Sequence, residues 1–285
     1  MYSQLKRSLA PRAAAEFLLV RSMRALLAIL LFLLLAGCGQ KAKEVPPFQI
    51  IATDSGFEAP GALAAGMRHI IFENRGSKIH EAMLVRLAKG MTPDDYQAEL
   101  KKGEQFPKGA LDYSGPGSTS PGRTAEMWLK VDPGNYVLIC WNHPKTVKLH
   151  PFTVEDVGAV DDQPPPEDVV LKLIDYRFEL SRPLGKGTQV IRVETPGPSM
   201  HELDFFRLHD GQTAADVHRW SKGKDTDQAP FEALGGALDN HDITRVVWLR
   251  KEFTPGRYVL HCEMPVANTK LRHDDVGMIQ EIEIK

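Results

Sequence analysis

The chain of 285 residues repeats itself once, with matching segments 121 or 122 residues apart. The segment HEAMLVRL, which begins at His80, returns as HELDFFRL at His201. The segment DPGNYVLIC, which ends at Cys140, returns as TPGRYVLHC, which ends at Cys262. A repeat of this length is that of a whole domain. We therefore expect two copies of one domain, copy 1 at residues 48–156 and copy 2 at residues 168–285.

The residues between the copies, 157–167, contain three consecutive prolines and predict a stiff, extended linker. Both copies are rich in short runs of β-branched and aromatic residues bounded by glycine and proline, such as RHIIFEN and RVVWLRKEF. Such strands without alternating helices indicate a β-sandwich. The sequence leaves open whether the two copies pack together.

Each copy also carries one polar segment with the residues that start a helix. Thr92 precedes Pro93, and Thr213 precedes AADVHRW, so each threonine is placed to cap a helix. The sequence therefore predicts an all-β fold of two tandem Greek-key β-sandwiches, each with a short helical insertion.

The first forty residues are expected to lie outside this fold. Basic side chains in residues 1–24 precede an apolar run at 25–36, which is short for a membrane span and typical of a secretory signal. The following LAGC, ending at Cys38, resembles the lipobox of bacterial lipoproteins. This resemblance implies a signal peptide at 1–37, acylation of Cys38 and a tether at 38–47. The protein would then lie in the cell envelope, lipid-anchored to the membrane and facing the periplasm or the exterior. An uncleaved anchor helix and an ordinary signal peptide are the alternatives.

Charge and motifs exclude several classes of function. Removing residues 1–37 takes away five basic side chains and one acidic one, which changes the formal net charge from −2 to −6. With no long basic run, nucleic acid is not expected as a partner. The sequence has no glycine-rich phosphate loop, Ser-His-Asp pattern or HExxH motif, so nothing supports hydrolytic catalysis. The oligomeric state is not determined.

Two cysteines, Cys140 and Cys262, remain beside Cys38. In an oxidising compartment a disulfide between them is the simplest interpretation. However, Tyr258, Leu260 and Cys262 alternate along one strand and share its apolar face, and the equivalent residues of copy 1 do the same. Each thiol should therefore point into its own sandwich, beyond the reach of a bridge.

The residues around these cysteines resemble cupredoxins, the plastocyanin and azurin class of copper proteins, over nearly the whole chain after the tether. In copy 2 the resemblance covers four positions, with His201 as the early histidine and Cys262, His273 and Met278 in the last loop. It implies a type 1 copper held by two imidazoles and a thiolate, with a long thioether contact. The loop is expanded, with ten residues between Cys262 and His273. The alternative is a retired site with a buried cysteine.

Copy 1 matches this pattern less completely. His80, Cys140 and His143 correspond to three of the ligands, but position 148, where the methionine should stand, is lysine. A three-ligand site is chemically possible, and a degenerate copy fits the missing methionine better. We therefore expect one copper per chain, and a second only if copy 1 is competent.

Copy 2 also resembles the first domain of copper nitrite reductases and the multicopper oxidases. His261 stands beside Cys262, and Asp204 falls where those enzymes have a proton-handling aspartate. Phe206 replaces the second early histidine, and His-x-His pairs are absent from the sequence. Oxidase or reductase chemistry is therefore not expected. Strand alternation predicts that His261 points away from the core, to the surface or between the domains.

The resemblance implies a single-electron carrier that serves a redox partner protein, with His273 as the exposed exit edge. The carboxylates that follow His273, Asp274 and Asp275, are either partners for its ring or a solvated loop. Copper storage or delivery is a second hypothesis, favoured if Met264 and Met278 are exposed beside the metal. A metal-free interaction scaffold is the third.

Overall fold

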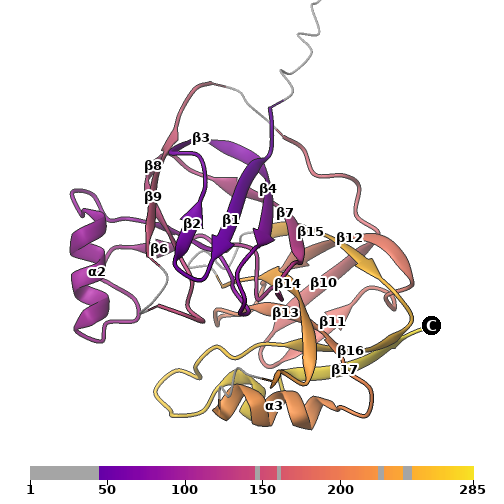
Figure 1. The fold of residues 1–285 in the computed structure, drawn as a ribbon. Helices are drawn as coiled ribbons and strands as arrows, with labels where there is room; N and C mark the ends of the chain where they lie inside the picture. Colours follow the sequence, from indigo (N-terminus) through magenta and orange to yellow (C-terminus); the bar gives the residue numbers. More distant parts are fainter. Residues whose placement is uncertain (1–44, 145–147, 159–161, 224–227, 240–245) are drawn as a thin grey trace, which may run out of the picture. The chain divides into compact units, whose positions relative to one another are not determined.

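The strands of both copies join in one continuous eight-stranded sheet, in the order β11-β10-β12-β15-β7-β4-β1-β2 (Figure 1). Copy 1 contributes β1 (Phe48–Thr53), β2 (Gly56–Glu58), β4 (Gly66–Asn74) and β7 (Thr124–Val131). Copy 2 contributes β10 (Val169–Ile174), β11 (Arg177–Leu180), β12 (Gly187–Glu194) and β15 (Val246–Phe253). The two copies therefore pack together through backbone hydrogen bonds.

The junction between the copies is the antiparallel pair β7 and β15. Leu249 pairs with Met127, and Trp248 pairs with Trp128. Met127 and Leu249 are themselves equivalent, since each lies thirteen residues before the cysteine of its copy. A pair of equivalent residues that face each other marks an approximate two-fold axis. Counted outward from the junction, the two halves of the sheet contain equivalent strands in the same order, so that β4 matches β12 and β2 matches β11.

Each copy completes its sandwich with a smaller sheet. In copy 1 its order is β3-β9-β8-β5-β6, and in copy 2 it is β14-β13-β16-β17. The strands of copy 1 are β3 (Ala62–Ala64), β5 (Met83–Arg86), β6 (Leu111–Asp112), β8 (Gly134–Ile139) and β9 (His150–Glu155). Those of copy 2 are β13 (Leu203–Leu208), β14 (Phe231–Ala237), β16 (Gly256–His261) and β17 (Ile279–Ile284), with the short 3₁₀ helix η2 (His273–Val276) before β17.

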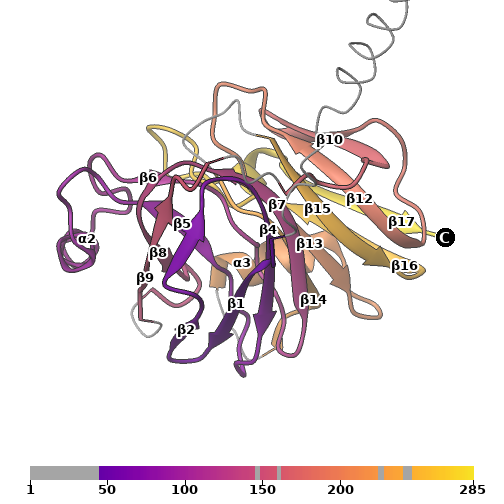
Figure 2. The same ribbon diagram turned by 90° about the horizontal axis from the view of Figure 1, so that it is seen from above.

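One helix covers the outer face of each smaller sheet (Figure 2). In copy 1 this is α2 (Pro93–Lys101), which begins with a capping box between Thr92 and Asp95. In copy 2 it is α3 (Ala214–Gly223), where Val217 packs with apolar residues of β13, β14 and β16. The all-β prediction, with one helical insertion in each copy, is confirmed.

The main core runs without a break through both sandwiches. Alternation along β1 and β4 buries every second side chain, such as Ile50 and Phe72, as a strand with one apolar face requires. Met127 and Leu249, which face each other at the junction, belong to the same hydrophobic cluster as Cys262. The inner ends of the smaller sheets are therefore buried against the shared sheet.

The computed structural model describes residues 45–144, 148–158, 162–223, 228–239 and 246–285, all within one compact unit, Glu44–Lys285. The expected signal peptide 1–37, Cys38 and nearly all of the tether 38–47 lie outside the described residues. In the part described, no helix has the length and apolarity to cross a membrane. Within the expected linker, Asp162 accepts a hydrogen bond from the backbone N–H of His69 in β4, at 3.0 Å. The domain boundaries stay predictions.

Candidate metal centre

The four residues that the sequence singled out in copy 2 come from the same end of the smaller sheet. His201 precedes β13, Cys262 follows β16, and His273 and Met278 lie in the loop that returns to β17. Because β13, β16 and β17 are hydrogen-bonded neighbours, the ends of these strands bring the four residues to one place. All four side chains are buried.

Three donor atoms converge at this place. His201 Nδ1 lies 3.0 Å from His273 Nδ1, which lies 3.3 Å from Cys262 Sγ. The donor atoms of these three residues all lie within 4.8 Å of one another. Donors that share one ion at bond lengths of about 2.0 to 2.3 Å stand roughly 3 to 4 Å apart. The spacing therefore fits a metal ion bound by two imidazoles and a thiolate.

Met278 joins this group through its backbone. Its carbonyl accepts a hydrogen bond from Cys262 N at 3.2 Å, and its N–H donates to His273 O at 2.8 Å. The turn before it uses Gly277 at φ 114°, a left-handed conformation that glycine adopts without strain. Met278 is thus held between two of the donors, and its sulfur as a fourth ligand stays a prediction.

An aspartate that the sequence analysis missed fixes the ring of His201. Asp175, in the turn between β10 and β11, accepts a hydrogen bond from His201 Nε2 at 2.6 Å and another from Ser199 Oγ at 3.0 Å. With its proton on Nε2, the ring directs the lone pair of Nδ1 toward Cys262 and His273. Metal-bound histidines usually have such a partner on the other nitrogen.

The repeat itself marks this aspartate. Asp54 of copy 1 accepts a hydrogen bond from His80 Nε2 at 2.9 Å, and each aspartate lies 26 residues before its histidine. A glycine makes room for the contact in copy 1, because a Cβ at Gly76 would lie 2.6 Å from Asp54 Oδ1. Comparing the two copies for shared carboxylates would have found both contacts.

Burial sets the protonation states of the group. It raises the pKa of the Cys262 thiol well above its usual range and lowers the pKa of His273 to about 4, helped by the adjacent His201. Burial also lowers the pKa of His201 against the opposing effect of Asp175. Both imidazoles are therefore neutral at pH 7, as ligands must be, and a metal ion would displace the thiol proton.

Copy 1 retains only part of this arrangement. Cys140 Sγ lies 3.5 Å from His80 Nδ1, but His143 directs its Nε2 to the carbonyl of Ile79, at 3.0 Å. The rings of His80 and His143 meet edge to face with centroids 4.9 Å apart. Among the residues that the structure describes, the donor atoms of this trio do not form a group within 4.8 Å. Copy 1 thus brings His80 and Cys140 close together, and its interpretation as a degenerate copy stays a prediction, as does its ligand set.

The strand register identifies what replaces the methionine. Gly134 pairs with Val154, and in copy 2 Gly256 pairs with Ile284, so counting six residues back aligns Lys148 with Met278. Lys148 is exposed, and its N–H is bonded to Ser55 O at 3.1 Å. Copy 1 therefore has no thioether at the position that Met278 takes in copy 2.

His273 is not the exposed edge that the sequence suggested. Only 2 % of its surface is accessible, and the ring of Tyr176 meets it edge to face at a centroid distance of 4.8 Å. Tyr176 comes from the turn between β10 and β11, a segment far from His273 in sequence. The expectation was wrong because a residue outside the loop covers the imidazole.

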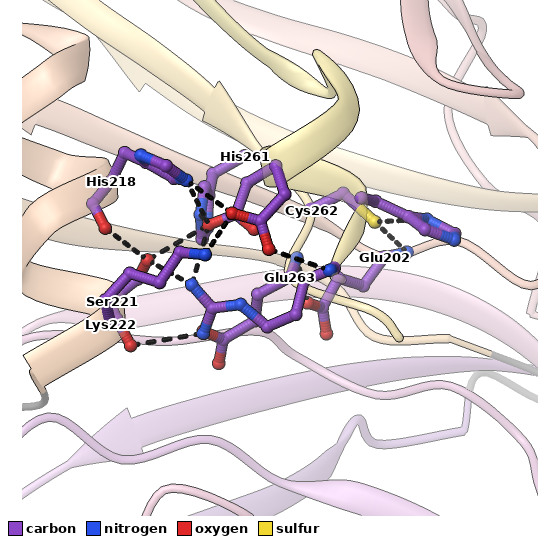
Figure 3. A network of polar contacts seen from close by, with 11 residues as sticks. Glu202, His218, Ser221, Lys222, His261, Cys262 and Glu263 are labelled. Carbon is purple, nitrogen blue, oxygen red and sulfur yellow. Dashed lines mark hydrogen bonds and ion pairs between the residues drawn. The ribbon is translucent and has the colours of Figure 1, made fainter. Parts of the chain in front are cut away.

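His261 does point away from Cys262, as strand alternation predicts, but it is buried and does not lie at the surface. Its Nε2 lies 3.2 Å from Asp274 Oδ2, which also accepts from Ser221 Oγ and from Arg272. Figure 3 shows this network, with residues of α3 on one side and Cys262 on the other. Asp274 thus lies within hydrogen-bond distance of His261, and it acts on His273 electrostatically, by opposing the lowering of its pKa.

His218 of α3 extends the same network. Its Nε2 lies 3.0 Å from Asp275 Oδ1, which also forms an ion pair with Lys222. His218, Asp274 and Asp275 are a second group whose donors lie within 4.8 Å of one another. Because Arg272 and Lys222 already neutralise the two carboxylates, this group is explained as a structural ion-pair network.

Both cysteines of the described chain are free and buried, as expected from the strand pattern. Burial raises the pKa of the Cys140 thiol to about 12. The absence of a bridge among the described residues agrees with the placement of each thiol inside its own sandwich.

No protein-family model and no curated protein matches this chain. Among solved structures, it is similar to auracyanin B, with 15% identity, a TM-score of 0.30 and coverage of 44% of this chain and 92% of the other. It is also similar to a multicopper oxidase, with 13% identity, a TM-score of 0.25 and coverage of 84% and 89%. A copper-containing nitrite reductase from Thermus scotoductus SA-01 shares 14% identity over 84% of this chain and 61% of that one, with a TM-score of 0.23.

These proteins belong to the classes that the sequence resembles. Likenesses at such low identity and TM-score carry no argument about function. The metal centre therefore rests on its own residues.

Proposed function

We propose that this protein binds one copper ion in copy 2 and carries single electrons. The observation that supports this most directly is the convergence of three buried donor atoms, His201 Nδ1, His273 Nδ1 and Cys262 Sγ, with one imidazole oriented by Asp175. Two imidazoles and a thiolate near a thioether are the donor set of an electron-transfer copper site. Copper, when bound, would supply the one-electron redox chemistry.

The chain's residues would support that role in three ways. Asp175 holds the tautomer of His201, and the N–H of Glu202 donates to Cys262 Sγ at 3.4 Å, which stabilises negative charge on the sulfur. Tyr176 and the loop before β17 cover His273, which excludes water from the donors. A site whose donors are held before the metal arrives changes little between oxidation states, which favours rapid electron transfer.

Copper storage or delivery is the weaker candidate. Exposed methionines beside the metal would favour this hypothesis, but Met264 and Met278 are only 7% and 0% exposed. A delivery protein needs an accessible ligand from which a partner can take the ion. The burial of both thioethers therefore favours the electron carrier.

The place of the protein in the cell is part of the same proposal. The lipobox-like LAGC and the preceding apolar run support a lipid anchor on Cys38, in the cell envelope and facing the periplasm or the exterior. A soluble or membrane-bound redox protein would be the partner. Labelling with a radioactive fatty acid in cells, with Cys38→Ala as the control, tests the anchor.

The central experiment is an absorption spectrum of the purified protein after addition of Cu(II), with copper counted per chain. We expect one copper and an intense visible band from thiolate-to-copper charge transfer. A reversible one-electron titration then separates a carrier from a delivery module. A protein that stays colourless and retains no copper would exclude both, and would leave the metal-free scaffold.

A further inference from the structure

A second feature of the molecule lies between the two copies, next to the candidate copper site, and uses a different set of side chains. A cavity of about 280 Å³ is lined by residues from both copies. Its walls include five carboxylates, which are Glu81, Glu202, Asp204, Asp239 and Glu263. Of these five, only Asp204 was singled out from the sequence, for its place in the resemblance to the copper nitrite reductases and multicopper oxidases.

The fold holds several of these carboxylates in place from both sides. Glu81, which follows His80, accepts a hydrogen bond from Asn142 N at 3.1 Å. Glu202, the equivalent residue of copy 2, accepts from Glu263 N at 2.7 Å. The two glutamates are therefore equivalent residues of the repeat, and each is held by a backbone N–H from the segment that follows the cysteine of its own copy.

Asp204 links the two halves of the cavity. Its Oδ1 accepts a hydrogen bond from Ser118 N of copy 1 at 2.8 Å, although Asp204 itself belongs to β13 of copy 2. The cavity wall is thus built by the contact between the copies, and a single copy could not form it.

Asp239 provides the observation that points to a ligand. Its side chain lines the cavity and only 5% of the residue is exposed, yet its Oδ2 has no hydrogen-bond partner among the residues that the structure describes. A buried carboxylate oxygen without a partner is energetically costly. Asp112 of copy 1 lies close enough to Asp239 for the two buried carboxyls to repel each other, and burial, helped by this repulsion, raises the pKa of Asp112 to about 8. A cation that reaches Asp239 from the cavity would satisfy its oxygen and relieve this repulsion.

The charge of the cavity points the same way. Among the described lining residues the one cationic side chain is Arg272, and it is already paired with Glu263 and Asp274. Burial, together with repulsion from Glu81, raises the pKa of Asp204 to about 8, and burial raises that of Asp239 to about 7, although the buried Lys251 interacts with Asp204. A multivalent cation would remove the repulsion more completely than partial protonation.

We propose that this cavity binds a divalent metal ion of the Mg²⁺ and Mn²⁺ class, which keeps part of its water shell. The donors available on the carboxylate-lined wall are oxygens, which suit hard cations. No three of these carboxylates bring their oxygens within 4.8 Å of one another among the described residues. One or two carboxylates would therefore bind the ion directly and the others through its water, as is usual for Mg²⁺.

Binding of Mn²⁺ to the purified full chain tests this inference, since free Mn²⁺ gives an electron paramagnetic resonance signal that weakens when the ion is bound. We expect one bound Mn²⁺ that Mg²⁺ displaces. Asp239→Asn should weaken Mn²⁺ binding by about tenfold or more, because the substitution keeps the shape and removes one charge. Glu81→Gln should do the same from the other copy.

Two matched variants serve as controls. Glu155→Gln removes an exposed carboxylate from β9, and Asp275→Asn removes one from the ion-pair network next to α3. Both should bind Mn²⁺ as the wild type does. The inference fails if Mn²⁺ does not bind, if Asp239→Asn binds it unchanged, or if Asp275→Asn abolishes binding. It also fails if 1,4-diaminobutane raises the melting temperature through Asp239 while Mn²⁺ does not, because the occupant is then an organic cation.

Discussion

The two copies keep the same histidine, cysteine and aspartate and differ in the loop that follows the cysteine. In copy 1 ten residues, 140–149, join β8 to β9, and in copy 2 seventeen residues, 262–278, join β16 to β17. The longer loop has room for η2, which places His273 against His201 and Cys262. In copy 1 His143 is bonded to a backbone carbonyl and Lys148 takes the place of the methionine. The sandwich thus brings the early histidine and the cysteine together in both copies, and the loop after the cysteine determines whether a second imidazole joins them.

The largest effect should come from removing one thiol at a time. Cys262→Ser should abolish the visible charge-transfer band and tight copper binding, because the thiolate is the donor that gives both. Cys140→Ser should leave the band unchanged. Absorption spectra of the two variants with equal added Cu(II) measure this. If Cys140→Ser removes the colour, the assignment of the centre to copy 2 is reversed.

A second test asks whether the copies are energetically separate. Leu249→Ala at the junction should cost about 2 to 5 kcal/mol of unfolding free energy, since a fully buried leucine is truncated. Met127→Ala, the equivalent change in copy 1, should cost a similar amount. Because the two residues pack in one core, urea unfolding should remain a single transition by tryptophan fluorescence and circular dichroism. Two transitions would mean that the copies unfold independently despite the shared sheet.

A third test concerns the two aspartates that face the early histidines. Asp175→Asn should weaken copper binding by roughly 10- to 100-fold, as loss of a hydrogen-bond partner on a metal-bound histidine usually does. Asp54→Asn, at the matching position of copy 1, should not change copper affinity. Competition with a chelator of known affinity gives both values. Equal losses in the two variants would indicate a general effect on folding.

A fourth test concerns the pH dependence of stability at the junction that the copies share. The pKa values of Asp204 and Asp239 are raised, so above about pH 4 the folded state holds protons that the unfolded state has released. Stability should therefore fall as pH rises toward 7, by up to about 1.4 kcal/mol per pH unit for each proton. Lys251 acts oppositely above pH 7, because burial lowers its pKa to about 7 while the unfolded lysine stays charged.

Urea unfolding in the presence of a chelator, between about pH 5 and 7, measures this slope. Asp239→Asn should flatten it, and Glu155→Gln, which changes an exposed carboxylate, should not. Buried histidines with lowered pKa values, His201 and His273 among them, oppose this trend below about pH 6.5, so the comparison of variants is decisive. A slope that Asp239→Asn leaves unchanged would contradict the assignment of raised pKa values to the cavity.

Local patterns predicted much of this molecule. Short segments of the sequence were sufficient to predict the repeat, the strands, the two helix caps and the four candidate donors of copy 2. No sequence pattern indicates that β7 pairs with β15, because pairing between distant strands depends on backbone N–H and C=O groups, which every strand has. The shared sheet was therefore not predictable.

The environment of the site was predicted less well than its residues. His273 was expected at the surface, but Tyr176, nearly a hundred residues earlier, covers it. His261 was expected at the surface or between the domains, but it is buried with its Nε2 3.2 Å from Asp274 Oδ2. In both cases burial is set by segments remote in sequence. Asp175 differs, since its equivalence to Asp54 was present in the repeat and was overlooked.

The pairing of Met127 with Leu249 has a consequence for how such a chain could arise and be dissected. Each copy offers the other an edge strand, and equivalent residues meet at the axis, so the arrangement is that of a homodimer whose subunits have become covalently joined. A single copy expressed alone would leave the edge of β7 or β15 unpaired, and an open edge promotes association with another chain. Isolated halves of this protein should therefore dimerise or aggregate, and neither half is a self-sufficient fragment.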